Sequence, residues 1–249
     1  MIGGCPRSGT TLLRCLLGSH PNIGCEVETR VFHRTVLPKH VERLAMWLGL
    51  DRAVVDQLYR SSTAQAQFVE RLFAEYCRVR GKPRWAEKTP DNVKVVDYIF
   101  EHFPRAKFVH GIRDGRDVVC SFRTHPSAKI VGGVAHPVET RRSVEHCARR
   151  WTKAVAGGLR FRGHPGYHEV RYEDLVAQPE EALRELLTWA GEPWDDAVLQ
   201  PIYSSAIGRW RDDLTPDEAE TVVQIAGPLL AELGYAEDAS WVREHAMAH

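Results

Sequence analysis

The sequence GGCPRSGTTLL, at residues 3–13, has nearly the spacing of a nucleotide-binding P-loop. Gly4 and Gly9 are five positions apart, as in G-x-x-x-x-G-K-[ST], and Thr11 occupies the position of the magnesium-binding hydroxyl. The position of the phosphate-binding lysine holds Thr10 instead. A strand that enters such a turn and continues as a helix directs several backbone N–H groups at one point, where the helix dipole favours an anion. The segment therefore predicts an anion-binding loop that lacks the lysine of a kinase.

The side chains of this loop add further donors. Arg7 can bind an anion through two parallel hydrogen bonds, and Ser8 and the two threonines supply hydroxyl groups. A P-loop kinase would need a lysine at the β- and γ-phosphates and a second acidic motif for magnesium, and neither is evident. The loop therefore favours a ligand with a smaller terminal anion than a γ-phosphate. A plain strand-to-helix turn, capped by serine and threonine, is the structural alternative.

A second basic motif, RDGRDVVCSF, begins at the end of the clearest buried strand, AKFVHGIRD. Arg113 ends this strand, and open α/β sheets bind their ligands at the carboxyl ends of their strands. This position makes Arg113 a candidate for ligand binding. The alternative is a solvated strand end with a helix cap, which remains the simplest interpretation of Asp114, Arg116 and Asp117.

Together, PRSGTTLL and RDGRDVVCSF resemble the sulfotransferase family that uses 3′-phosphoadenosine 5′-phosphosulfate (PAPS) as its donor. Within that family, the longer segment PRSGTTLLRCLLGSHPNIGCEVETRVF is most similar to the tyrosylprotein sulfotransferases. The likeness covers most of the chain, from Gly4 through EKTP, RDGRD and VRYEDL to the final helix. It implies an α/β protein with a P-loop-like three-layer fold, in which helices flank a central parallel sheet.

The resemblance also implies a donor site, which would release 3′-phosphoadenosine 5′-phosphate (PAP). The 5′-phosphosulfate would be held by Arg7, Ser8, Gly9, Thr10 and Thr11. The 3′-phosphate would be held by Arg113, Ser121, Arg209 and Arg211, the last two from the late segment GRWR. Tyr172 would lie near the nucleotide, and Trp210 would pack on a lid over it. No metal is expected at this site.

Sulfuryl transfer requires a deprotonated acceptor oxygen, in-line geometry and positive charge at the leaving oxygen. Glu28, in EVETRVF, matches the carboxylate that acts as general base in the tyrosylprotein enzymes. Lys88, in EKTP, matches a lysine that contacts the sulfate or the bridging oxygen, and Arg7 would assist it from the loop. Glu26 and His33 remain alternative bases.

The acceptor is less well defined than the donor. Arg30 resembles a family residue near the acceptor site, but the double glutamate of the tyrosylprotein pattern is Val27-Glu28 here. Peptide specificity is therefore not carried over, and the acceptor is a hydroxyl of a phenol, an alcohol, a sugar or a peptide. Glu87 is expected to pair with a basic neighbour as a structural residue.

Apolar, β-rich runs alternate with helical patterns, which is typical of an α/β domain with a parallel sheet. Strands are expected at residues 1–3, 84–86, 106–114 and 167–175. Helices are expected at residues 10–17, 92–103, 139–155, 179–190 and 216–230, with a mostly helical stretch at 37–80. We predict one domain over residues 1–249, with lid-like loops at about 126–137 and 201–213.

Composition bounds the partners. The 249 residues include 33 basic and 33 acidic side chains, so net charge gives no reason to expect nucleic acid or an anionic membrane. No apolar run approaches the roughly 20 residues of a membrane span, and no signal peptide is evident. Six scattered cysteines without a C-x-x-C pair fit a reducing cytoplasm, where we expect this enzyme. A P-loop kinase and a non-catalytic nucleotide-binding module are the alternatives.

Overall fold

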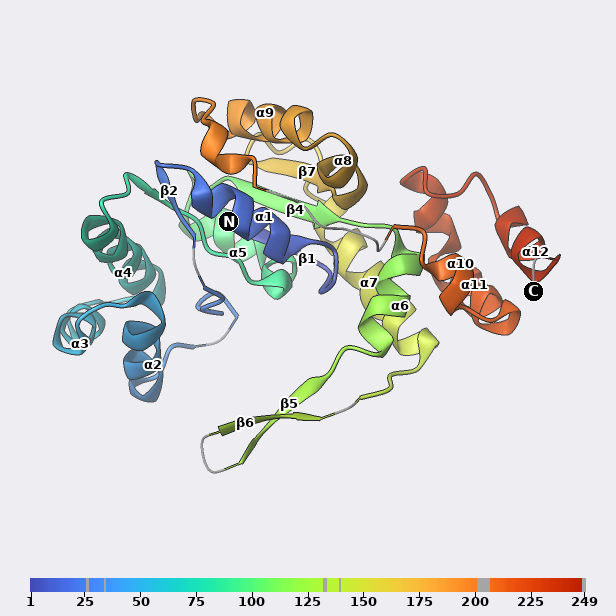
Figure 1. The fold of residues 1–249 in the computed structure, drawn as a ribbon. Coiled ribbons are helices and arrows are strands. Elements are labelled where there is room, and N and C mark those ends of the chain that lie inside the picture. Colours follow the sequence, from blue (N-terminus) through green and yellow to red (C-terminus); the bar gives the residue numbers. More distant parts are fainter. Residues whose placement is uncertain (26, 34, 132–133, 139, 201–206, 248–249) are drawn as a thin grey trace.

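The computed structural model describes residues 1–25, 27–33, 35–131, 134–138, 140–200 and 207–247. Its central sheet is parallel, with the strand order β1 (Ile2–Gly4), β4 (Phe108–Ile112), β7 (Tyr167–Arg171) (Figure 1). The register places Gly4 beside Gly111, at the carboxyl ends of β1 and β4. The segments that follow these two strands therefore start from the same edge of the sheet, which is where such sheets bind ligands.

The residues of β4 alternate between two apolar cores. Phe108 and Ile112 belong to one core and Val109 to the other, because successive strand residues face opposite sides of the sheet. The helices that complete these cores are α5 (Val96–His102) and α7 (Val144–Leu159) on one face, and α1 (Thr10–Ser19) and α9 (Pro179–Ala190) on the other. This order of helix, sheet and helix confirms the predicted three-layer α/β fold (Figure 1).

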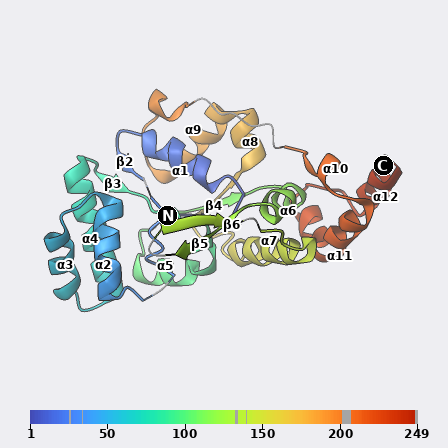
Figure 2. The same cartoon turned by 60° about the horizontal axis from the view of Figure 1, so that its bottom comes forward.

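The predicted helical stretch at 37–80 is confirmed as a group of helices beside the sheet (Figures 1 and 2). Its members are α2 (Pro38–Leu48), α3 (Arg52–Arg60) and α4 (Gln65–Arg80). The short strands before and after the group, β2 (Ile23–Gly24) and β3 (Arg84–Trp85), pair in parallel. Beyond β3, Lys88 forms a bridge with Ile2, so the chain continues beside β1 and delivers Lys88 to the edge of the sheet.

The remaining helices follow the strands or complete the C-terminal part. They are η1 (Pro90–Lys94), α6 (Gly115–Arg123), α8 (Tyr172–Ala177), η2 (Asp196–Val198), α10 (Trp210–Asp213), α11 (Pro216–Glu232) and α12 (Ser240–Met247). The start of α11 is a capping box, in which the Thr215 hydroxyl accepts from the Glu218 N–H and the Glu218 carboxylate accepts from the Thr215 N–H.

The segment predicted as a loop at 126–137 contains a β-hairpin instead. Strands β5 (Ser127–Val131) and β6 (Val134–Val138) pair antiparallel and extend away from the sheet and helices (Figure 1). In the sequence the two strands are separated by Gly132-Gly133, which lies outside the described residues. Gly-Gly is a preferred two-residue hairpin connection, so the sequence does contain a signal for this hairpin. In the second predicted loop, residues 201–206 lie outside the description and α10 forms beyond them. A lid role for either segment stays a prediction.

The cysteines of the chain are free thiols, and all but Cys15 are buried. Burial raises the pKa of the Cys5, Cys25 and Cys120 thiols to about 12, so these side chains stay protonated and act as small apolar residues. In the part of the chain that the structure describes, no helix is long and apolar enough to cross a membrane.

A buried histidine on β4 gives a prediction about acid stability. His110 is fully buried with Nδ1 2.6 Å from the Tyr167 hydroxyl, and burial lowers the pKa of His110 to about 4. As the pH falls below about 6.5, His110 therefore takes up a proton in the unfolded chain but stays neutral in the folded protein. Between pH 6.5 and 4, we expect His110 to cost the fold about 3 kcal/mol. The measurement is urea unfolding against pH, in the wild type and in His110→Gln, and parallel pH dependences would contradict the expectation.

Candidate active site

The anion-binding loop joins β1 to α1 and depends on two glycines. Gly4 (φ 151°) lies so close to Gly111 that a Cβ would be 2.3 Å from the Gly111 carbonyl oxygen. A Cβ on Gly9 (φ 80°) would be 2.4 Å from the ring of Tyr172. Arg7 also has a left-handed backbone (φ 76°), which is uncommon for a residue with a side chain and points to a functional constraint.

The donors of this loop are positioned for a ligand. No side chain caps the amino end of α1 among the described residues, so its first N–H groups are available to an anion. Ser8 is buried, and its hydroxyl has no hydrogen-bond partner among the residues that are described. A buried polar group without a partner is costly, and a bound anion would supply the missing partner.

Three arginines converge beside the loop. The Arg7 Nε donates to Ser121 Oγ (3.0 Å), and the Arg113 Nη1 donates to the Arg7 carbonyl oxygen (3.3 Å). The pKa of Arg7 is lowered first by burial and then by the positive charges of Arg113 and Arg209. Arg113 is almost fully buried, with its guanidinium 4.6 Å from the centre of the Tyr172 ring. Repulsion among the three cations makes this position favourable for an anion.

Asp117 anchors the late basic segment to α6. Its carboxylate accepts from the Gly208 and Trp210 N–H groups (2.8 and 3.1 Å) and lies 3.5 Å from Arg113 Nη2. Burial raises the pKa of Asp117. Arg209 lies between Gly208 and Trp210 in the sequence, so the anchor holds it near Arg7. Arg209 also pairs with Asp213. Asp117 is therefore more than the solvated residue that the sequence suggested.

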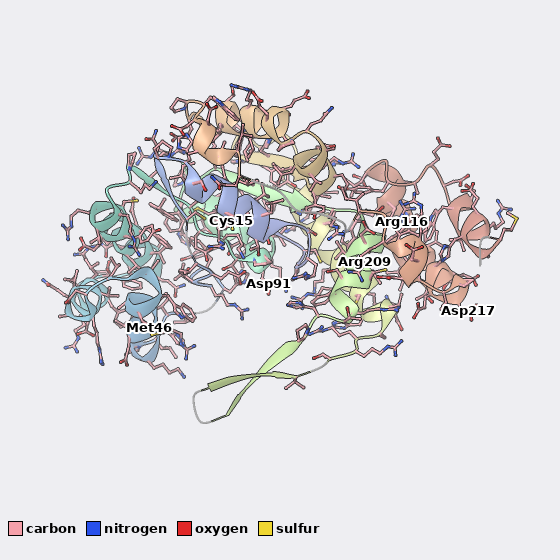
Figure 3. The ribbon with its side chains drawn as sticks, in the orientation of Figure 1. Cys15, Met46, Asp91, Arg116, Arg209 and Asp217 are labelled. Atoms are coloured by element: carbon pink, nitrogen blue, oxygen red, sulfur yellow. The ribbon has the colours of Figure 1, made fainter. Side chains whose placement is uncertain are left out.

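Trp210 and Arg211 take a different direction from Arg209. Trp210 is buried against Arg116 and Trp241, with the Arg116 guanidinium 4.2 Å from the centre of the Trp210 ring. Arg211 is exposed and lies over the Trp210 ring (4.6 Å). Figure 3 shows Arg116 and Arg209 at the junction of α6 with the C-terminal helices. The structure thus brings Arg209 to the loop and packs Trp210 toward helix α12.

The residues predicted to react, Glu28 and Lys88, are in contact at the loop. The Lys88 ammonium donates to the Glu28 carboxylate and to Thr11 Oγ1 (3.3 Å). The Lys88 side chain is 2 % exposed, whereas that of Glu28 is 36 % exposed. A buried cation therefore touches both the anion-binding loop and a carboxylate that solvent or an acceptor can reach. The sequence placed the two charges in one site, and the structure brings them into contact.

The alternative bases occupy other positions. Glu26 lies outside the described residues. His33 lies among Asp91, Asn92 and Lys94, and burial lowers the pKa of its imidazole. The structure thus brings Glu28, and not His33, into contact with Lys88.

A cavity of about 320 Å³ opens beside Glu28. Its wall is formed by Thr29, Arg30, Val31, Val36, His40, Arg43, Leu44 and Trp47. Arg30 is exposed at this wall, as expected for a residue near the acceptor. The contribution of helix α2 was missed, because no local pattern tells which face of that helix meets Glu28. The wall of the cavity combines apolar, aromatic and basic side chains. Such a wall suits an aromatic acceptor with a negative charge.

The expectation that Glu87 pairs with a basic neighbour is wrong. In the described part of the chain, its buried carboxylate accepts only from uncharged groups of Thr29, Thr89 and Asn92. Nor does any group of three or more His, Cys, Asp or Glu side chains in that part have the arrangement of a metal site. No pattern in the sequence indicated these hydrogen bonds of Glu87.

Fold and site together define an α/β protein with a P-loop-like loop that uses arginine and hydroxyl donors at the edge of a parallel sheet. The chain belongs to the sulfotransferase family, whose family model matches residues 1–196. The predicted family is thereby confirmed.

Named relatives agree with this membership. A protein-tyrosine sulfotransferase of Drosophila melanogaster is 31% identical in an alignment that covers 94% of this chain and 51% of the relative. Protein-tyrosine sulfotransferase 1 of Danio rerio is 30% identical over 94% of this chain and 71% of its own length. For the human protein-tyrosine sulfotransferase 1, the values are 31%, 94% and 68%. The chain thus spans about half the length of the Drosophila relative.

Solved structures support the fold. The sulfotransferase domain of the Synechococcus PCC 7002 olefin synthase superposes with a TM-score of 0.61 at 20% identity, over 90% of this chain and 93% of that one. Sulfotransferase STF9 of Mycobacterium avium gives a TM-score of 0.55 at 17% identity, over 93% and 75%. At these identities the likeness concerns the fold alone.

Proposed function

We propose that this protein transfers the sulfuryl group of PAPS to a hydroxyl group of an acceptor, with PAP as the second product. The observation that carries the proposal is the contact of Lys88 with both Thr11 of the anion-binding loop and the half-exposed Glu28. Membership of the sulfotransferase family supports the reaction class. In a non-catalytic nucleotide-binding module, this buried lysine and its carboxylate would have no role.

The residues present fit the donor. Its two anionic ends call for two clusters of donors, and the chain offers the loop, whose Ser8 hydroxyl has no partner among the described residues, and the neighbouring group of Arg113, Ser121 and Arg209. In this proposal the loop holds the 5′-phosphosulfate, and Arg113, Ser121 and Arg209 hold the 3′-phosphate. When bound, PAPS supplies the sulfuryl group and a good leaving group.

The protein's part in the transfer is to position charge and to move one proton. Glu28 accepts the proton of the acceptor hydroxyl while the hydroxyl oxygen bonds to the sulfur of the donor. The bond from this sulfur to the leaving oxygen breaks at the same time. Lys88 and Arg7 stabilise the negative charge that develops on the leaving side. The contacts of Lys88 with Thr11 and of Arg7 with Ser121 support these roles, because charged groups that are held in position before a reaction need little reorganisation.

For the acceptor we propose a phenolic hydroxyl, on a peptide or on a small molecule. The relatives named as protein-tyrosine sulfotransferases support this choice, and so does the cavity beside Glu28 with Trp47 and Arg43 in its wall. A phenol ionises near pH 10, well below an aliphatic alcohol, so a carboxylate base suffices more easily.

We also propose a cytoplasmic location for this protein.

Thermal denaturation with ligands tests the donor assignment. At about 100 times its Kd, PAP should stabilise the fold by about 3 kcal/mol, which corresponds to roughly 5–10 °C in Tm for a domain of this size. Adenosine 5′-monophosphate, which differs from PAP only by lacking the 3′-phosphate, is the matched ligand and should shift the Tm less. The same shift is expected in EDTA. A larger shift with ATP and magnesium than with PAP would instead indicate a kinase.

The acceptor class is tested by turnover with ³⁵S-labelled PAPS. Equal panels of phenols, sugars and tyrosine peptides should give label in the phenols or the peptides. Transfer only to sugars would contradict the phenolic acceptor and leave the donor assignment intact.

A further inference from the structure

We propose that Glu87 is a positioning residue, whose buried carboxylate clamps the loop that carries Glu28 onto the segment that carries Lys88. The inference rests on the proposed function, because it assigns the clamp to the geometry of the proposed base and cation. Glu87 itself does not touch the reacting groups; it acts through Thr29 and Thr89.

The clamp consists of short hydrogen bonds to a fully buried carboxylate. Glu87 Oε1 accepts from the Thr29 N–H (2.9 Å), the Thr29 hydroxyl (3.0 Å) and the Thr89 hydroxyl (2.7 Å). Glu87 Oε2 accepts from Asn92 Nδ2 (2.7 Å), and Asn92 also donates to the Ile2 carbonyl oxygen (3.1 Å). Bonds to an ionised acceptor are stronger than bonds between neutral groups. Glu87 therefore ties the Glu28 loop, η1 and β1 to one point.

Two pairs of neighbouring residues face each other across this junction. Glu28 and Thr29 are adjacent, as are Glu87 and Lys88, and neighbours in an extended chain point to opposite sides. On one side the buried Lys88 contacts the partly exposed Glu28, and on the other side the fully buried Glu87 contacts Thr29. The contact between Glu87 and Thr29 thus fixes the spacing of the two segments beside the proposed base, Glu28, and the proposed cation, Lys88.

Thr89 extends the clamp to a strained residue. Its hydroxyl donates to Glu87, and its Oγ1 accepts from the Arg30 N–H (3.3 Å). Arg30 has a left-handed backbone (φ 58°), which a residue with a side chain adopts only when its surroundings hold it there. The relay from Glu87 through Thr89 supplies such a restraint directly after Glu28 and Thr29.

Amide hydrogen exchange tests the clamp without reference to activity. The matched variants are Thr89→Val, which keeps the shape of the side chain but removes the hydroxyl, and Thr89→Ser, which retains the hydroxyl. In Thr89→Val we expect the Arg30 amide, which loses its acceptor, to exchange at least about tenfold faster, and the Thr29 amide, whose acceptor Glu87 loses one of its donors, to exchange faster to a smaller degree. In Thr89→Ser they should exchange as in the wild type, and amides of residues 5–12 should be unchanged in both. Equal exchange in the two variants overturns the clamp.

Kinetics tests the positioning role. Displacement of a reacting group by about 1 Å costs roughly a hundredfold in rate, so a partly released loop should lower kcat about 10–100-fold in Thr89→Val. Thr89→Ser should restore kcat, and the Kd of PAP should stay within about twofold in both variants. A purely structural Thr89 would lower Tm in Thr89→Val and leave kcat unchanged, which contradicts the proposal.

Glu87→Gln provides a second variant with the same shape and no charge. It loses the charge-assisted bonds and turns one acceptor into a donor that faces Asn92, so we expect faster exchange at Thr29 and a lower kcat. Unchanged exchange and kcat in Glu87→Gln would also contradict the clamp. If the wild-type protein transferred no sulfuryl group at all, the proposed function would fail, while hydrogen exchange would still decide whether Glu87 restrains this loop.

Discussion

Glu28→Gln is expected to reduce kcat about a thousandfold, because glutamine keeps the shape of the side chain but cannot take a proton from the acceptor. The loop and the arginines that bind the donor do not depend on the Glu28 charge, so the Kd of PAP should change less than about twofold. Initial rates with labelled PAPS and a phenolic acceptor, together with calorimetric titration of PAP, measure the two quantities separately.

His33→Gln is the matched control for Glu28→Gln. It makes a similar change on the same segment, but His33 lies among Asp91, Asn92 and Lys94, away from the contact with Lys88. We expect His33→Gln to retain most of its kcat. Retained turnover in Glu28→Gln with loss in His33→Gln would move the base to His33, and retention in both would direct attention to Glu26.

The fold could be predicted wherever the signal was local. The glycine spacing, the mainly apolar, β-rich run of β4 and the capping box of α11 each depend on residues near one another in the sequence. The glycine and proline residues of segment 126–137 favour a loop, so the hairpin was not predicted. Two β-rich runs on either side of Gly132-Gly133 are nevertheless typical of a hairpin.

The site could be predicted only in part, because its contacts join distant residues. Lys88 and Glu28 are 60 positions apart, and only the family resemblance suggested that they belong together. The same resemblance grouped Arg209 with Trp210, yet successive side chains at the start of a helix point in different directions, and Trp210 packs on Arg116. No local pattern indicated that the buried Glu87 would accept from Thr29.

Lys88→Met should lower kcat about 100–1000-fold, because methionine fills the same buried space without the charge that stabilises the leaving side. Stability should change little, since the abandoned Glu28 is partly exposed and can be hydrated. Single-turnover rates with saturating PAPS measure the loss, and chemical denaturation checks the fold. If Lys88 and Glu28 act as one unit, the double variant with Glu28→Gln should lose little more than the single variants, as residues that act together are strongly non-additive. Full additivity would show that the two charges serve separate steps, and full activity in Lys88→Met would remove this lysine from the mechanism.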